Sequence, residues 1–284
     1  MRRTWHWLWV LCLGAWGCAG PAATGVDLES KAVSLNDAGY QYYRQSRWNL
    51  AQEKFEQALK YNRLIDRRGG IAANLNNLGG VAQEQGQLPA AVQYFQAALQ
   101  INRELPDPGA LSETLNNLGV AYQAQGRLGE AEAAFQEARQ WDRNLPPGPL
   151  TALTLMHLGD VARARRDYLL AINYYHQALL VDEARKDVQG RAMRGERLGR
   201  TFLDLKDYGR AHAYLREALA EFRRLQDTSG IADALKDLTL LALAQGDQKE
   251  ALLTGNLLME LYQARGQEEE AKKLEAILKS GKPH

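Results

Sequence analysis

Small and apolar residues recur along this 284-residue chain with a period of 40 positions. The period is clearest in two copies of one motif, Leu75-Asn76-Asn77-Leu78-Gly79 and Leu115-Asn116-Asn117-Leu118-Gly119. Glycine recurs in this frame at Gly39, Gly79, Gly119, Gly159 and Gly199. A large residue follows sixteen positions later, between two recurring alanines, at Phe55, Phe95, Phe135, Tyr175 and Leu215. A fixed period of this length is the signature of a repeat protein.

Within one unit, the apolar positions follow the spacing of two successive α-helices. In the third unit the first helix has its apolar residues on one face, at Leu115, Leu118 and Tyr122. The second helix has the same arrangement at Ala131, Phe135 and Ala138, and Gly126 marks the turn between the two. We expect the glycine and the first alanine to leave room where the helices cross, and the aromatic residue to fill the gap. Breaks between units are predicted at 106–109, 146–149, 187–190 and 227–230.

This pattern resembles the tetratricopeptide repeat, and the long units with an Asn-Leu-Gly core are similar to those of kinesin light chains and G-protein-signalling modulators. The resemblance implies an all-α fold, a right-handed superhelix (solenoid) of antiparallel helix pairs. It covers residues 30–265 as six repeats, at about 30–69, 70–109, 110–149, 150–189, 190–229 and 230–265. The amphipathic segment at 266–284 suits a C-terminal capping helix followed by a tail, with a frayed end as the alternative.

The N-terminal segment differs from the rest of the chain. Arg2 and Arg3 precede a 13-residue uncharged apolar run, which is the layout of an export signal. A helix of this length would reach about 20 Å, short of the roughly 30 Å that a transmembrane anchor needs, so we favour the signal. The residues around Cys18 resemble the lipobox of bacterial lipoproteins. That resemblance implies a signal peptide at 1–17, a flexible tether at 18–29, acyl chains on Cys18 and, because Ala19 follows, the periplasmic face of the outer membrane.

Charge and motif content exclude several functions. The chain has 35 Lys and Arg against 34 Asp and Glu, a net charge of +1 that becomes −1 once Arg2 and Arg3 are removed. Such neutrality argues against nucleic-acid binding. Removal of the signal also leaves Cys18 as the one thiol, so no disulfide framework is expected. We find no phosphate loop, metal-ligand spacing or catalytic constellation, and therefore predict a non-enzymatic protein without cofactor or metal.

The resemblance places candidate binding residues on the concave face, where first helices of successive units line one groove. Amides and tyrosines dominate the first three units, at Asn36, Tyr40, Tyr43, Asn76, Asn77, Gln83, Asn116, Asn117 and Gln123. The next two units contribute His157, Arg163, Arg197 and Arg200. Amides pair with the backbone of an extended peptide, and arginines hold carboxylates. The alternative is structural: the asparagines bridge helices, and Asp160, Glu196 and Asp204 balance the arginines.

We therefore expect a membrane-anchored adaptor that binds other proteins or peptides in its groove, in assembly of the cell envelope or of a secretion complex. Binding of C-terminal carboxylates is disfavoured, because the family's basic clamp positions carry Asn36 and Asn116. The alternative function is an extracytoplasmic sensor whose superhelix changes shape on binding a peptide or small ligand.

Overall fold

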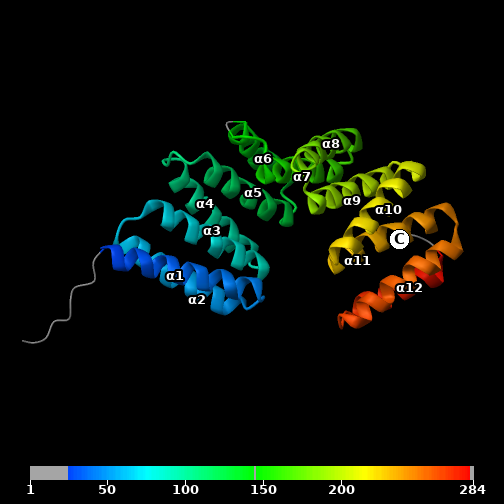
Figure 1. The fold of residues 1–284 in the computed structure, drawn as a ribbon, viewed down its shortest axis with the longest axis horizontal. Coiled ribbons are helices and arrows are strands. Elements are labelled where there is room, and N and C mark those ends of the chain that lie inside the picture. Colours follow the sequence, from blue (N-terminus) through cyan, green and yellow to red (C-terminus); the bar gives the residue numbers. More distant parts are fainter. Residues whose placement is uncertain (1–24, 144, 282–284) are drawn as a thin grey trace, which may run out of the picture.

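The computed structural model describes residues 25–143 and 145–281, and in these residues every regular element is an α-helix (Figure 1). The candidate lipidation site Cys18 and the predicted signal peptide lie outside the described residues. The helices are α1 (Gly25–Arg44), α2 (Trp48–Leu64), α3 (Arg68–Glu84), α4 (Leu88–Asn102), α5 (Pro108–Ala124), α6 (Leu128–Asp142), α7 (Pro149–Ala164), α8 (Tyr168–Ala184), α9 (Val188–Asp204), α10 (Tyr208–Leu225), α11 (Thr228–Gln245), α12 (Gln248–Ala264) and α13 (Glu268–Ser280). Within the described part of the chain, no helix is long and apolar enough to cross a bilayer.

The odd-numbered helices from α1 to α9 each pack against the next helix through a glycine and a large side chain. A methyl group on Gly119 would lie 2.5 Å from a ring carbon of Phe135, so only glycine lets the two helices approach this closely. The same contact recurs in the other four of the first five units, at Gly39 with Phe55, Gly79 with Phe95, Gly159 with Tyr175 and Gly199 with Leu215. All five large side chains are almost fully buried. The expected role of the recurring glycine is therefore confirmed.

The turns between helices repeat every 20 residues. A residue with positive φ ends most helices, as glycine at Gly86, Gly126, Gly246 and Gly266 and as other residue types at Ser46, Asp66, Arg166, Lys186, Lys206 and Gln226. The next helix often begins with an aspartate whose carboxylate accepts a backbone N–H bond three residues on, at Asp107, Asp167, Asp187, Asp207, Asp227 and Asp247. Such caps stabilise a helix by about 1 kcal/mol each. From Asp167 to Asp247 every helix has one, whereas α2, α3, α4 and α6 begin without.

The helix pairs stack into an all-α repeat superhelix that forms an open arch (Figure 1). Backbones of odd-numbered helices in successive repeats come close to one another from α3 to α11, which places these helices on the inner side of the curve. Buried apolar side chains form one continuous stripe from Ala82 to Leu278, and a smaller cluster joins the first two repeats.

The two ends differ in how they match expectation. Helix α1 begins at Gly25, so residues 25–29 are helical where a tether was expected; Asp27 in the first turn favours a helix start. At the other end, α13 occupies the region of the expected capping helix. Its residues Leu274 and Leu278 are buried, and the Leu278 side chain packs against Gly255 of α12. The thirteenth helix thus covers the apolar face of the last pair.

Candidate binding groove

The concave side of the first three repeats is joined by a chain of amide and tyrosine hydrogen bonds. The Tyr40 hydroxyl of α1 donates to Asn77 of α3 at 2.8 Å, and the Asn77 amide donates to Asn36 of α1 at 2.9 Å. The Asn117 amide of α5 donates to Asn76 of α3 at 3.2 Å. Tyr43 donates to Glu84 at 3.5 Å. The structure brings these candidate residues together, and each of these bonds joins two helices, as the structural alternative has it.

Two adjoining hollows of about 190 and 280 Å³ open between these side chains. They share a floor formed by Tyr40, Asn76, Asn77 and Glu113. The first extends toward α1 and α3, along Tyr43 and Gln83, and the second toward the start of α5. Tyr40 keeps 44% of its surface exposed. Its ring packs edge to face on that of Phe55, with 5.5 Å between the ring centres. The first three odd-numbered helices therefore present an accessible groove with both aromatic and amide walls.

Two of the predicted site residues, Asn116 and Gln123, do not line this groove. Asn116 is only 1% exposed, and its amide donates to the Ser112 carbonyl and to Thr154 of α7 at 2.8 Å. It joins two repeats inside the protein and offers no free amide to a ligand. Gln123 is half-buried and lines neither hollow.

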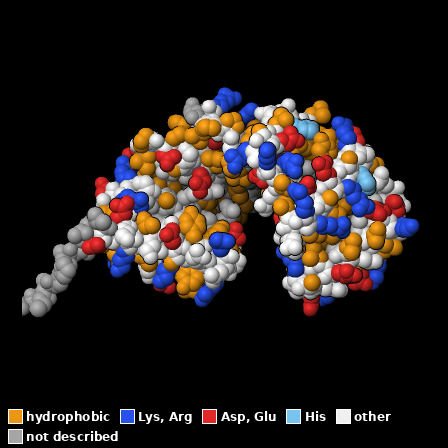
Figure 2. All heavy atoms as spheres, in the orientation of Figure 1, with side chains coloured by type: hydrophobic (Ala, Val, Ile, Leu, Met, Phe, Trp, Pro, Cys, Tyr) orange, Lys and Arg blue, Asp and Glu red, His pale blue; other side chains and the backbone are white. Residues whose placement is uncertain are grey.

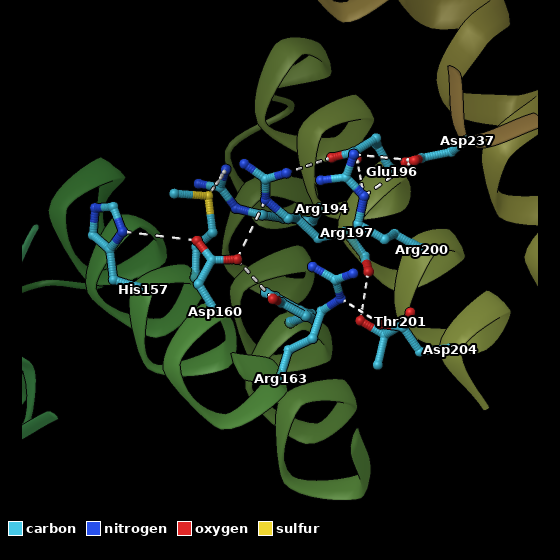
Figure 3. A network of polar contacts seen from close by, with 12 residues as sticks. His157, Asp160, Arg163, Arg194, Glu196, Arg197, Arg200, Thr201, Asp204 and Asp237 are labelled. Carbon is cyan, nitrogen blue, oxygen red and sulfur yellow. Dashed lines mark hydrogen bonds and ion pairs between the residues drawn. The ribbon is translucent and has the colours of Figure 1, made fainter. Parts of the chain in front are cut away.

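In the next repeats the candidate side chains belong to a network of ion pairs (Figure 3). Arg163 of α7 contacts Asp204 of α9 at 2.7 Å. Arg197 of α9 contacts Glu196 at 3.0 Å and Asp160 of α7 at 3.3 Å. Arg200 contacts Asp237 of α11 at 3.0 Å. Each of the three arginines thus has an acidic partner inside the chain, including all three acids that the structural alternative named.

His157 lies at the edge of this network. Its ring stacks on Phe135 with 4.9 Å between ring centres, and Nδ1 is 3.9 Å from Asp160. Burial lowers the pKa of His157 to about 4, with the positive charges of Arg194 and Arg197 acting in the same direction and Asp160 opposing them. The imidazole is therefore neutral at pH 7 and acts as a flat packing surface.

Burial also shifts the pKa values of acidic and basic groups in the network. Glu196 is almost fully buried, and loss of water together with the charge of Asp237 raises its pKa to about 7, against the opposing effect of Arg197 and Arg200. Burial by itself would lower the pKa of Arg200, but the charges of Asp237 and Glu196 outweigh it and raise that pKa. The guanidinium groups therefore stay charged and held in place.

The sequence motifs did not reveal one set of buried polar residues, which lie near the C-terminal ends of even-numbered helices. Asn62 donates to Asn74 at 2.7 Å, Asn102 to Thr114 at 3.0 Å, and Arg194 contacts Asp182 at 3.3 Å. Each pair joins one repeat to the next. The signal was available, because the residues recur with the 40-residue period at Asn62, Asn102, Asp142 and Asp182.

Within residues 25–143 and 145–281, no group of His, Cys, Asp and Glu side chains is arranged to hold a metal ion. The class of protein that this fold defines is a repeat scaffold, whose stacked units present one extended concave surface. One model of the tetratricopeptide repeat matches residues 30–104, 70–144 and 110–184 in overlapping frames, and a second such model matches residues 196–264. The chain belongs to the tetratricopeptide repeat family.

Solved structures share the fold at low sequence identity. BtubC (BKLC) from P. vanneervenii is 20% identical with a TM-score of 0.64, over 84% of this chain and 92% of that one. A putative kinesin light chain with nearly identical TPR-like repeats, from Podosopora anserina, is 18% identical with a TM-score of 0.57, over 70% and 98%. A Rap protein complexed with competence and sporulation factor is 15% identical with a TM-score of 0.67, over 91% and 76%. No curated protein matches the chain in sequence. The expected likeness to kinesin light chains is confirmed.

Proposed function

We propose that this protein is a non-catalytic scaffold that binds an extended or helical segment of another protein along α1, α3 and α5. The observation that carries the proposal is the pair of adjoining hollows whose floor is Tyr40, Asn76, Asn77 and Glu113. Membership of the tetratricopeptide repeat family supports it, as does the structural likeness to a Rap protein that was solved with a bound factor.

The groove suits a segment read partly through its backbone. An amide side chain donates and accepts together, so Asn77 and Asn117 can exchange their present partners for the N–H and C=O groups of a ligand. Tyr40 offers an exposed ring on which a ligand side chain can pack. The arginines of the later repeats are committed to acids of the chain itself, so binding by Arg163, Arg197 and Arg200 would first require those ion pairs to open.

Crosslinking in intact cells tests this assignment. Partners captured by the native protein should be lost when Asn77 and Asn117 are both replaced by alanine. The matched control is Gln93→Ala with Gln140→Ala, which removes two exposed amides from the even-numbered helices α4 and α6. An identical partner list for the Asn77→Ala/Asn117→Ala variant and the native chain would move the binding site away from this groove.

We further propose that the scaffold is exported and held by lipid on Cys18 at the periplasmic face of the outer membrane, where it serves envelope or secretion-complex assembly. The layout of residues 1–25 supports this proposal. Two or more acyl chains anchor a protein stably, because each buried methylene contributes about 0.8 kcal/mol. Cys18→Ser should move the protein from the membrane fraction to the soluble fraction, and continued retention in the membrane would exclude the lipid anchor.

A second candidate function is a sensor that closes around a peptide or small ligand. It is favoured by the open arch, which leaves a hollowed space between the first and the second half of the molecule (Figure 2). Small-angle scattering distinguishes the two functions. Compaction on adding a ligand would favour the sensor, whereas an unchanged shape in a stable protein complex would favour the scaffold.

A further inference from the structure

The centre of the groove holds an acid, Glu113, that has no partner among the described residues. Glu113 stands on the first turns of α5 and lines both hollows, beside Tyr40, Asn76 and Asn77. Among the residues that the structure describes, none gives its carboxylate a hydrogen bond or an ion pair. This contrasts with Asp160, Glu196, Asp204 and Asp237 of the later repeats, each of which contacts an arginine.

The surroundings of Glu113 are negative, and its side chain is exposed in the groove. Neither hollow has a Lys or Arg among its lining residues. The walls of the groove desolvate the carboxylate and raise the pKa of Glu113, and the charge of Asp107 adds to the effect. Glu113 in turn contributes, after burial, to the raised pKa of Tyr40. A positive charge placed here would relieve this repulsion, whereas a ligand carboxylate would increase it.

We infer that the groove selects a protein segment with a Lys or Arg side chain, which Glu113 binds while Tyr40 and Asn77 hold the neighbouring residues. The inference rests on the proposed function of this groove and adds its charge preference. A basic side chain meets an acceptor in Glu113 and an aromatic face in Tyr40, which together favour a cation. This preference is opposite to the one that Arg163, Arg197 and Arg200 were expected to set.

A selection from random peptides tests the inference. Phage-displayed dodecapeptides would be selected on the native chain, on Glu113→Gln and on Glu56→Gln, which makes the same charge change on α2, outside both hollows. The native chain and Glu56→Gln should enrich sequences with Lys or Arg at one shared position, and Glu113→Gln should not. Glutamine keeps the size of the side chain, and circular dichroism checks that each variant is folded.

The strongest peptide is then synthesised with an acetylated N-terminus, with its basic residue either kept or replaced by norleucine. In the native chain the replacement should weaken binding about tenfold, the order expected of a hydrogen bond to a charged group. In Glu113→Gln it should weaken binding less than about twofold.

The possible failures are distinguishable. If no peptide is enriched on the native chain, the proposed groove function fails together with the inference. Peptides enriched without a basic position, or with an acidic one, would leave the groove as a binding site and overturn its charge preference. A preference for Lys or Arg that persists in Glu113→Gln would also overturn the inference. So would binding that needs a free N-terminal amine, because the cation would then be the chain terminus.

Discussion

The two halves of this superhelix use their inner helices differently, although they share one repeat. In α1, α3 and α5 the concave side chains are neutral amides and tyrosines around Glu113, which has no partner within residues 25–143 and 145–281. In α7 and α9 the corresponding surface is occupied by arginines, which bind acids of α7, α9 and α11. The same scaffold thus provides an open groove in one half and an internally satisfied surface in the other. Position in the repeat decides where a side chain points, and its partners decide whether it is free to bind.

The largest difference between the halves should appear when a charge is removed. Asp237→Ala removes the buried acid closest to Arg200 and leaves Glu196 at 3.6 Å as its remaining partner, so the loss should lie at the low end for a broken buried ion pair, about 3 kcal/mol. Asn77→Ala in the first half removes an amide that water can replace and should cost less than about 1 kcal/mol. Urea denaturation gives both free energies of unfolding. Equal losses would show that the two inner surfaces contribute alike to stability.

Lowering the pH should destabilise the second half of the molecule through His157. Below pH 6.5 the unfolded chain binds a proton at this residue, whereas the folded chain does not until about pH 4. The free energy of unfolding therefore decreases from pH 6.5 to pH 4, by up to about 3 kcal/mol from this group.

Glu196 acts in the opposite direction. Its pKa is raised to about 7, so the folded chain keeps a proton that the unfolded chain releases above pH 4.5, and this group stabilises the fold as pH falls. Urea denaturation of the native chain and of His157→Gln at a series of pH values separates the two. The native chain should lose stability relative to the variant between pH 6.5 and 4, and parallel curves would contradict the assignment.

A smaller difference is expected at the turns. Lys206 stands in the turn after α9 with a φ of 60°, a conformation that costs a residue with a side chain about 1 kcal/mol. Gly126 has the equivalent place in the turn after α5, with a φ of 74°. Lys206→Gly should therefore raise the free energy of unfolding by about 1 kcal/mol, and Gly126→Ala should lower it by a similar amount. If Lys206→Gly destabilises the protein, the Lys206 side chain makes a contact that outweighs the strain of its backbone.

The repeat itself could be predicted because its signals are local. Gly119 and Phe135 stand in one unit, and their contact follows from helical spacing alone. The burial of Asn116 could not be predicted in this way, although Asn116 occupies the same repeat position as Asn36. Its burial depends on how closely α5 and α7 approach and on Thr154 being there to accept its hydrogen bond. The ion pairs of Arg163 and Arg200 likewise depend on side chains about 40 residues away, in neighbouring repeats.

The contact between the glycine and the large side chain forms within a single repeat. A repeat can therefore be gained or lost as a whole without breaking this contact. An unequal crossover between the coding sequences of 75–79 and 115–119 would add or remove one whole unit and leave every internal contact intact. Each duplication would extend the groove by one inner helix, about 10 Å, which equals roughly three residues of an extended ligand. The length of the groove can therefore evolve in steps of one repeat, without redesign of the fold.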